Sequence, residues 1–288
     1  AKVYAYQLQG TALPLRLSYA NNVVHIERSL TGDQLESSQL GIELIGARGL
    51  VADVEVLLVA REVLEELGLE NYQINVADHR TAKLLLSATG APSRIRDEVR
   101  RAIIARDPDA VREILTGLGA REVYVEALAV LSELRDGAEQ LDTIRELLAT
   151  HVKVLERLDY LRALERTIDE LGYAANVRLD LGELGGASYY TGMGFNVVAE
   201  GVGREIGRGG RYDDLIGRFG QPSPAVGFSF SLETIVEFLH ASRPHSLRRA
   251  NGKDAIYVDP SDPVKGLHAA LERRRKNRAA RVVSRPQE

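Results

Sequence analysis

The sequence predicts an α+β protein in which two sheet-forming parts are separated by an all-helical segment. Residues 1–78 and 173–243 contain short stretches whose apolar residues alternate or run continuously, as in half-buried strands. Residues 79–172 are instead poor in glycine and carry Ala, Leu, Glu and Arg at helical spacing. We therefore expect a core in two parts, interrupted by a helical insert. Residues 244–288 predict a small C-terminal β-α-β remnant, too short for an independent domain of ordinary size.

The first part of the core is expected to contain strands around a single helix. Asn22–Glu27 and Gln39–Ala47 have alternating or continuous apolar residues, with a polar, glycine-punctuated loop between them. Asp53–Leu67 has apolar residues at helical spacing and predicts a helix, which Gly68 is suited to end. Asn71–Asp78 predicts the strand that follows.

The helical insert carries one clear start signal and one long apolar stripe. Asp107 followed by Pro108 predicts the N-cap and first turn of a helix. Between Gln140 and Leu171 apolar residues recur at helical spacing, with charged residues between them. This pattern predicts one long amphipathic helix.

The second part of the core combines strands with a dense group of glycines. Strands are predicted at 176–181, 188–200 and 225–230, and an amphipathic helix at 232–240. Glycine is frequent from residue 182 to residue 210, which indicates tight turns and close backbone approach, usually around a ligand.

The sequence GGRYDDLIGRFG, residues 209–220, is the most informative part of this glycine-rich region. Its first two glycines are expected to end a strand, after which Arg211 and Tyr212 open a helix. Asp213 and Asp214 would then lie in the first helical turn, where the helix dipole favours acidic residues. Tyr212, beside two glycines, either projects into a cavity or is a core tyrosine with a satisfied hydroxyl.

Motifs for dinucleotides and metals are absent from the sequence. Gly201, Gly203 and Gly207 have the spacing G-x-G-x-x-x-G without a helix directly after them, so they do not form a dinucleotide-binding fingerprint. The 6 histidines lie far apart and lack the spacing of metal ligands. We therefore expect neither a metal site nor a cofactor.

Composition indicates an ordinary globular protein. The sequence has no apolar run long enough for a membrane span, no signal peptide is recognisable, and there is no cysteine, which is compatible with the cytoplasm. The net charge of −4 divides unevenly: residues 241–288 have 12 Lys/Arg and 5 Asp/Glu, or +7, which leaves −11 for the rest. Such a basic end binds RNA in some proteins, but no aromatic residues are interleaved with the charges, so a solvated helix face is favoured.

Four segments resemble a known family. They are IERSLTGDQLESSQLGIELIG, GGASYYTGMGFNVV, GGRYDDL and PAVGFSFSLETI. Together, from about Leu15 to His240, they resemble histidyl-tRNA synthetase and its catalytically silent paralogue, the regulatory subunit of ATP phosphoribosyltransferase. The resemblance implies a class II synthetase-like antiparallel sheet flanked by helices, and a homodimeric core.

At three positions the resemblance leads us to expect arginine, and this chain has another residue. The motif 2 arginine, which grips the α-phosphate of ATP, corresponds to His25. The arginine that acts on the activated carboxyl group corresponds to Gly185, and the motif 3 arginine to Thr234. Guanidinium groups provide much of the charge stabilisation in adenylate formation, so no catalytic residue is expected here.

The amino-acid side of the family's pocket is better retained. Positions that contact histidine in the synthetase correspond here to Gln39, Glu43, Tyr190 and Tyr212. A carboxylate and two hydroxyl groups suit an ammonium and an imidazole. The alternative is that these side chains only hold together a polar network of the core.

The selective loss of the arginines favours a regulator over an enzyme. The resemblance implies a subunit that binds the short-form catalytic subunit of ATP phosphoribosyltransferase in a cytoplasmic hetero-oligomer. Such a subunit activates its partner and mediates histidine feedback in the first step of histidine biosynthesis. Two alternatives remain open, namely a stand-alone histidine- or tRNA-binding paralogue and a residual amino-acid-activating enzyme.

Overall fold

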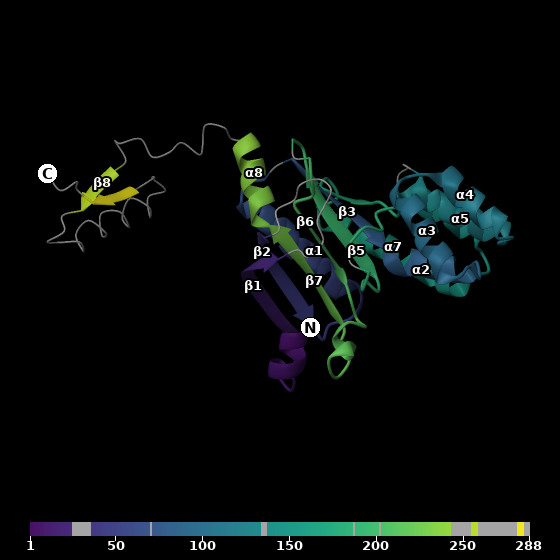
Figure 1. Ribbon diagram of the computed structural model, residues 1–288, viewed down its shortest axis with the longest axis horizontal. Helices are drawn as coiled ribbons and strands as arrows, with labels where there is room; N and C mark the ends of the chain where they lie inside the picture. The colour runs from purple at the N-terminus through teal and green to yellow at the C-terminus, as the bar shows by residue number, and fades with distance from the viewer. Residues whose placement is uncertain are drawn as a thin grey trace. The chain divides into compact units, whose positions relative to one another are not determined.

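A seven-stranded sheet forms the core of residues 1–238 (Figure 1). The computed structural model describes residues 1–24, 36–69, 71–133, 137–186, 188–201, 203–242, 255–258 and 281–284. These belong to two compact units, residues 1–238 and residues 239–288. His25 and the helix expected between the two strands of the C-terminal β-α-β remnant lie outside the described residues.

The strand order of the sheet is β1-β2-β7-β6-β5-β3-β4. All neighbouring strands are antiparallel except β3 and β4, which are parallel. This arrangement confirms the predicted α+β class with a mainly antiparallel sheet. The strands are β1 (Leu15–Val24), β2 (Glu36–Ile45), β3 (Tyr72–Asp78), β4 (Val177–Leu179), β5 (Met193–Ala199), β6 (Gly207–Arg211) and β7 (Ala225–Ser231).

Helix α1 (Gly49–Glu66) packs against β2 and β7 and begins at Gly49 rather than at Asp53. Gly68 ends it as predicted, with a φ of +71° that a glycine adopts without strain. The Gly68 N–H donates to the Glu65 carbonyl at 2.7 Å and the Leu69 N–H to the Leu64 carbonyl at 3.0 Å, so the last turn is closed by paired hydrogen bonds. Helix α8 (Leu232–Ser242) follows β7 directly.

The helices between β3 and β4 gather in one group beside the end of the sheet formed by these two strands (Figure 1). They are α2 (His79–Ala88), α3 (Ser93–Ile104), α4 (Pro108–Gly117), α5 (Glu122–Ser132), α6 (Gly137–Leu147) and α7 (Val152–Glu170). The predicted cap of α4 is confirmed, because the Asp107 carboxylate accepts a hydrogen bond from the Ala110 N–H at 2.9 Å.

The single long helix expected from Gln140 to Leu171 is wrong. The chain forms α6 and α7, which pack against each other, and His151 between them has a non-helical backbone (φ −91°, ψ 80°). Val152, a member of the predicted stripe, is 65% exposed, whereas Val154 is buried. Apolar spacing continues on both sides of this turn, and neither glycine nor proline marks it, so periodicity alone could not reveal the break.

The second unit contains the parallel strands β8 (Ala255–Val258) and β9 (Arg281–Ser284). They confirm the two strands predicted for the C-terminal segment. Among the described residues, no helix combines the length and apolar character required to cross a bilayer.

Candidate functional site

One face of the sheet has a floor of glycines. Glu43 on β2 lies opposite Gly227 on β7, which lies opposite Gly210 on β6, and Gly210 lies opposite Gly194 on β5. A methyl group on Gly210 would lie 3.1 Å from the Tyr190 ring, and one on Gly227 would collide with the Glu43 carboxylate. These glycines therefore let the larger side chains lie flat against the backbone.

Glu43 and Tyr212 form the centre of this site. The Tyr212 hydroxyl donates a short hydrogen bond to the Glu43 carboxylate. Burial raises the pKa of Glu43, although the hydrogen bond from Tyr212 opposes the shift. Burial also raises the pKa of Tyr212, and the nearby Glu43 charge raises it further. Tyr212 therefore stays protonated and acts as a hydrogen-bond donor.

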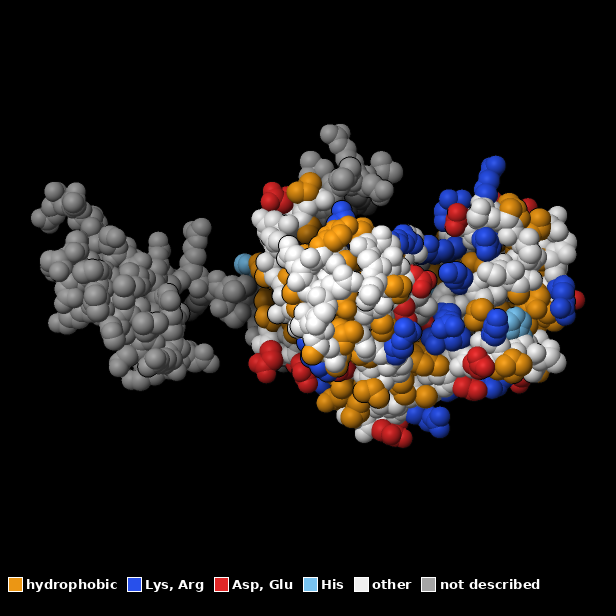
Figure 2. Space-filling model, turned by 90° about the horizontal axis from the view of Figure 1, so that it is seen from below, with side chains coloured by type: hydrophobic (Ala, Val, Ile, Leu, Met, Phe, Trp, Pro, Cys, Tyr) orange, Lys and Arg blue, Asp and Glu red, His pale blue; other side chains and the backbone are white. Residues whose placement is uncertain are grey.

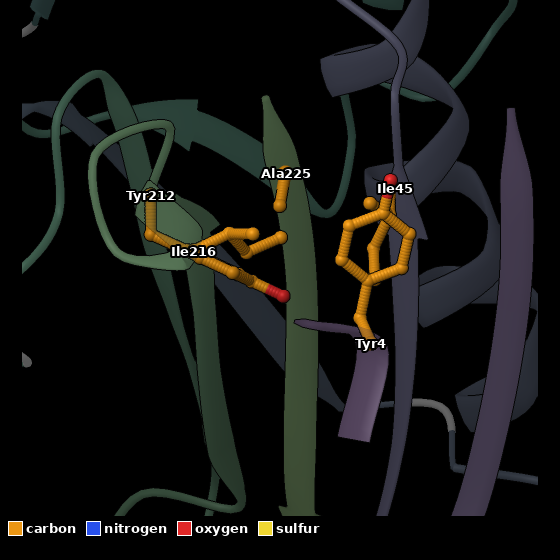
Figure 3. Packing of buried hydrophobic residues seen from close by; sticks show 5 residues of the cluster. All are labelled: Tyr4, Ile45, Tyr212, Ile216 and Ala225. Atoms are coloured by element: carbon orange, nitrogen blue, oxygen red, sulfur yellow. The ribbon is translucent and has the colours of Figure 1, made fainter. Parts of the chain in front are cut away.

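Packing against apolar side chains fixes the position of the Tyr212 ring. Figure 3 shows Tyr212 in one buried cluster with Ile216, Ala225, Ile45 and Tyr4. Tyr4 comes from a short helical turn, η1 (Tyr4–Leu8), near the start of the chain. The cluster holds the ring while its hydroxyl group reaches Glu43.

A row of aromatic rings extends from Tyr212 towards the helical part. Tyr189 contacts Tyr212 edge-on at a centroid distance of 5.8 Å and Tyr190 at 5.3 Å. Tyr190 in turn contacts His79, the first residue of α2, at 5.2 Å. Burial, with a smaller contribution from the Arg100 charge, lowers the pKa of His79 to about 4. His79 is therefore neutral near pH 7.

The structure brings three of the four predicted pocket residues together. Glu43, Tyr190 and Tyr212 are joined by direct contact or through Tyr189. Gln39 lies on the same face of β2 as Glu43. The two residues are four positions apart, however, which corresponds to about 13 Å along a strand. It is paired in register with Ser231 on β7, at the end of the sheet where α8 begins.

Sequence reasoning missed His79, Tyr189 and Tyr19 as site residues. The Tyr19 ring lies over Gly41, 2.5 Å from where a methyl group on this glycine would be. Burial raises the pKa of Tyr19, and the charge of Glu43 raises it further. Tyr189 was visible as the first of two adjacent tyrosines. His79 carried no local signal, because only the tertiary fold brings the start of α2 beside Tyr190.

The helix expected to open at Arg211 and Tyr212 is not formed. β6 ends at Arg211, a turn follows, and only Ile216–Arg218 (η2) makes a short 3₁₀ helix. Asp213 therefore does not lie in the first turn of a helix, where the helix dipole would favour it. Its carboxylate instead accepts hydrogen bonds from the Arg211 guanidinium at 2.9 Å and the Ala225 N–H at 3.1 Å. The acidic residue holds the turn against β7.

On the other face of the sheet, a buried ion-pair network joins the core to the helical part. Arg211 Nε donates to Asp53 of α1 at 2.8 Å, and the Tyr160 hydroxyl of α7 donates to the same carboxylate. Arg157 of α7 binds both oxygens of Asp78 at 2.7 and 3.0 Å. Asp78 also caps α2, so the residue before His79 is fixed from two sides.

The two described positions of lost arginines carry no positive charge. Thr234 is 2% exposed, and its N–H and hydroxyl both donate to Ser231 Oγ, at 3.2 and 3.0 Å, in the first turn of α8. Gly185 lies beside Glu183, whose carboxylate would be 2.7 Å from an added methyl group. The nearby Arg208 on β6 binds Glu205 at 2.6 Å. Thr234 and Gly185 thus contribute no cation to the site, whose central groups are the Glu43 carboxylate and the Tyr212 hydroxyl.

Comparison with known proteins identifies the family. A family model described as histidyl-tRNA synthetase matches residues 1–235. The ATP phosphoribosyltransferase regulatory subunit of Desulfitobacterium hafniense is 33% identical over 250 residues, which are 86% of this chain and 64% of that protein. The protein of the same description from Geobacter sulfurreducens is 31% identical over 276 residues, 96% of this chain and 63% of that protein. The chain thus spans less than two thirds of the length of these relatives.

A solved structure of a protein with a similar description resembles this chain in its fold. The ATP phosphoribosyltransferase regulatory subunit/histidyl-tRNA synthetase of Bacillus halodurans superposes with a TM-score of 0.76 at 28% identity, covering 98% of this chain and 71% of that one. This agreement extends the likeness from the motifs to the fold, including the helices between β3 and β4. Because the family model matches most of the sequence, the chain belongs to the histidyl-tRNA synthetase family.

Proposed function

We propose that this chain is a non-catalytic regulatory subunit of ATP phosphoribosyltransferase. It binds a short-form catalytic subunit in the cytoplasm, activates it, and mediates feedback by histidine in the first step of histidine biosynthesis. The relatives from Desulfitobacterium hafniense and Geobacter sulfurreducens that bear this description support the proposal. The homodimeric core implied by the family resemblance is part of it.

The observation that carries the proposal is that uncharged residues, Thr234 and Gly185, occupy two positions where the family resemblance leads us to expect arginine. Amino-acid activation develops negative charge on phosphate and carboxyl oxygens, and each lost charge-assisted contact costs on the order of 10²- to 10³-fold in rate. The Thr234 hydroxyl is engaged with Ser231, and Gly185 faces a carboxylate. Neither position can replace a guanidinium group, so a synthetase reaction is disfavoured.

Histidine is the ligand that the retained site suits best. Glu43 can accept a hydrogen bond from an imidazole N–H or an ammonium group, and Tyr212 and Tyr190 add hydroxyl groups. The Tyr212 hydroxyl donates only to Glu43 among the described side chains, so a ligand can take over this bond. Binding would shift the subunit between two states by the difference in its affinity for them.

Mixing with a short-form ATP phosphoribosyltransferase catalytic subunit tests the proposal. We expect the rate of phosphoribosyl-ATP formation to rise on addition of this chain, and inhibition by histidine to become stronger. A catalytic subunit whose rate and histidine sensitivity stay unchanged, despite complex formation on a sizing column, would contradict the proposal.

A separate assay tests the absence of catalysis. Pyrophosphate exchange into ATP in the presence of histidine reports amino-acid activation directly. We expect no exchange above the background of a Glu43→Ala variant. Robust exchange by the unmodified chain alone would contradict the non-catalytic assignment.

A further inference from the structure

A cavity of about 230 Å³ lies between the helical part and the loop that leads to Tyr190. Helices α2 and α3 form one wall, and Leu184, Ser188 and Tyr190 form the other. His79 and Tyr190 border both this cavity and the Glu43–Tyr212 site. Drug-sized ligands need about 300–1,000 Å³, so this cavity suits a smaller molecule.

The charge on the cavity wall is strongly positive. Lys83, Arg96 and Arg100 contribute three cations against the single carboxylate of Asp97. None of these four side chains forms an ion pair with a described residue, whereas five of the ten other described arginines of the helical part bind carboxylates. Figure 2 shows Lys and Arg side chains gathered where the helical part meets the sheet part.

Two of the cations are held in place by neutral partners. Arg100 Nη2 donates to the Leu184 carbonyl at 2.7 Å, across the cavity from its own helix. Arg96 Nη1 lies 3.4 Å from Ser87 Oγ on α2. Neutral acceptors fix the guanidinium groups without cancelling their charge, so further N–H donors remain for an anion.

The start of α3 adds to the positive wall. Ser93 is the first residue of this helix and lines the cavity. No side chain caps the helix, because its N-cap residue is Pro92. The unpaired N–H groups of a first turn and the helix dipole both favour an anion, in addition to the side-chain charges.

We propose that this cavity binds a small anion that carries a phosphate group. Three cations and an open helix start match a dianion of tetrahedral oxygens, and the enclosed volume suits a small carrier of the phosphate group. The anion would touch the wall that contains His79 and Tyr190, next to the proposed histidine site. The inference does not depend on a role in ATP phosphoribosyltransferase.

Calorimetry with two phosphate-bearing probes tests this site. Inorganic phosphate and glycerol 3-phosphate are titrated separately into the chain at constant ionic strength, which distinguishes a free phosphate from a phosphate on a carbon carrier. We expect saturable binding of at least one probe in the millimolar range or tighter. The double variant Lys83→Gln/Arg96→Gln should weaken it by a factor of ten or more, since two charge-assisted contacts are lost.

The control is Arg94→Gln/Lys153→Gln, which removes the same charge from exposed residues of α3 and α7 outside the cavity. It should leave binding within about two-fold, by the screening of exposed charges. Unchanged binding in the cavity variant, equal weakening in both variants, or no saturable binding of either probe would overturn the proposal. Tight binding of a short single-stranded RNA that neither probe displaces would also overturn it, in favour of a nucleic-acid surface.

Measuring the unfolding temperature of each variant distinguishes weaker phosphate binding from loss of folding. Lys83 is exposed and Arg96 only partly buried, so the cavity variant should unfold at the same temperature as the unmodified chain without phosphate. Added phosphate should raise the unfolding temperature of the unmodified chain and of the control, but not that of the cavity variant. An equal rise in all three would overturn the site.

Discussion

Arg211 and Tyr212 are neighbours in the chain, yet they point to opposite faces of the sheet and bind their carboxylates differently. Arg211 meets Asp53, and both are strongly buried, with exposures of 6% and 2%. Their pair is reinforced by Tyr160, by the Ala47 carbonyl at 3.2 Å and by Asp213. Tyr212 meets Glu43, whose carboxylate accepts no other side-chain hydrogen bond from the described residues.

The number of partners distinguishes a carboxylate with a structural role from one whose hydrogen-bond partner a ligand can replace. A carboxylate with several partners cannot release one of them for a ligand without leaving a buried charge unpaired. A carboxylate with one neutral partner can exchange that partner at little cost, since one hydrogen bond replaces another. We therefore regard the Arg211 face as part of the scaffold, and the Tyr212 face as the side on which the proposed histidine site lies.

The largest effect is expected from breaking the scaffold pair. Asp53→Ala leaves the Arg211 guanidinium buried without its main counter-charge, and should lower the free energy of unfolding by about 3–5 kcal/mol. Urea denaturation measures this change. The matched control on the same helix is Glu55→Ala, whose ion pair with Arg16 is 34% and 57% exposed, and which should cost under about 1 kcal/mol. Similar losses in both variants would contradict the distinction between the faces.

An intermediate effect is expected from pH at His79. Its pKa is about 4 in the folded chain and 6.5 in the unfolded one, so between these values the unfolded state binds more protons. Stability should therefore fall as pH decreases from 6.5 towards 4, by at most about 3 kcal/mol from this group. A His79→Gln variant should lack this part of the pH dependence. Parallel stability curves for variant and unmodified chain would show that His79 is not held neutral.

The smallest effect is expected at the exchangeable pair. Tyr212→Phe and Glu43→Ala should each weaken histidine binding by about 1–3 kcal/mol, the cost of leaving a buried polar group without its partner. Calorimetry with histidine measures the affinity. Tyr6→Phe, at a tyrosine that is 70% exposed, should have no effect. If both site variants bind histidine as well as the unmodified chain, the histidine site lies elsewhere, and the two faces differ less than proposed.

Local signals predicted the parts of the fold that local interactions determine. Gly68 and Asp107 are visible in the sequence, because a left-handed glycine and a capping carboxylate act within one turn. The turn at His151 was not predictable, because it joins two helices that pack on each other, and no glycine or proline marks it in the sequence. The helix expected at Tyr212 failed for a similar reason: Asp213 binds the chain across the sheet instead of its own helix.

The site was predictable only in part. Family motifs located Glu43, Tyr190 and Tyr212, and the structure joins them. His79 and the cations of α2 and α3 come from a segment that reads as a plain amphipathic helix, and only the return of the chain at Leu184 brings them beside Tyr190. The role of Gln39 stays a prediction. So do the boundaries of the four predicted parts of the chain, which are residues 1–78, 79–172, 173–243 and 244–288.

The glycine floor under Glu43 and Tyr190 makes the centre of the sheet intrinsically weak. A glycine in a strand is less stable than alanine by roughly 0.5–1 kcal/mol, and Gly227, Gly210 and Gly194 are neighbours on adjacent strands. Replacing them is not a route to higher stability, because a methyl group there meets backbone atoms as well as the side chains above. It would lie 2.4 Å from the Ile42 carbonyl oxygen at Gly227 and 3.0 Å from the Met193 carbonyl oxygen at Gly210. Stabilising substitutions should therefore be sought in the surrounding helices, because at this floor greater stability and an intact site are incompatible.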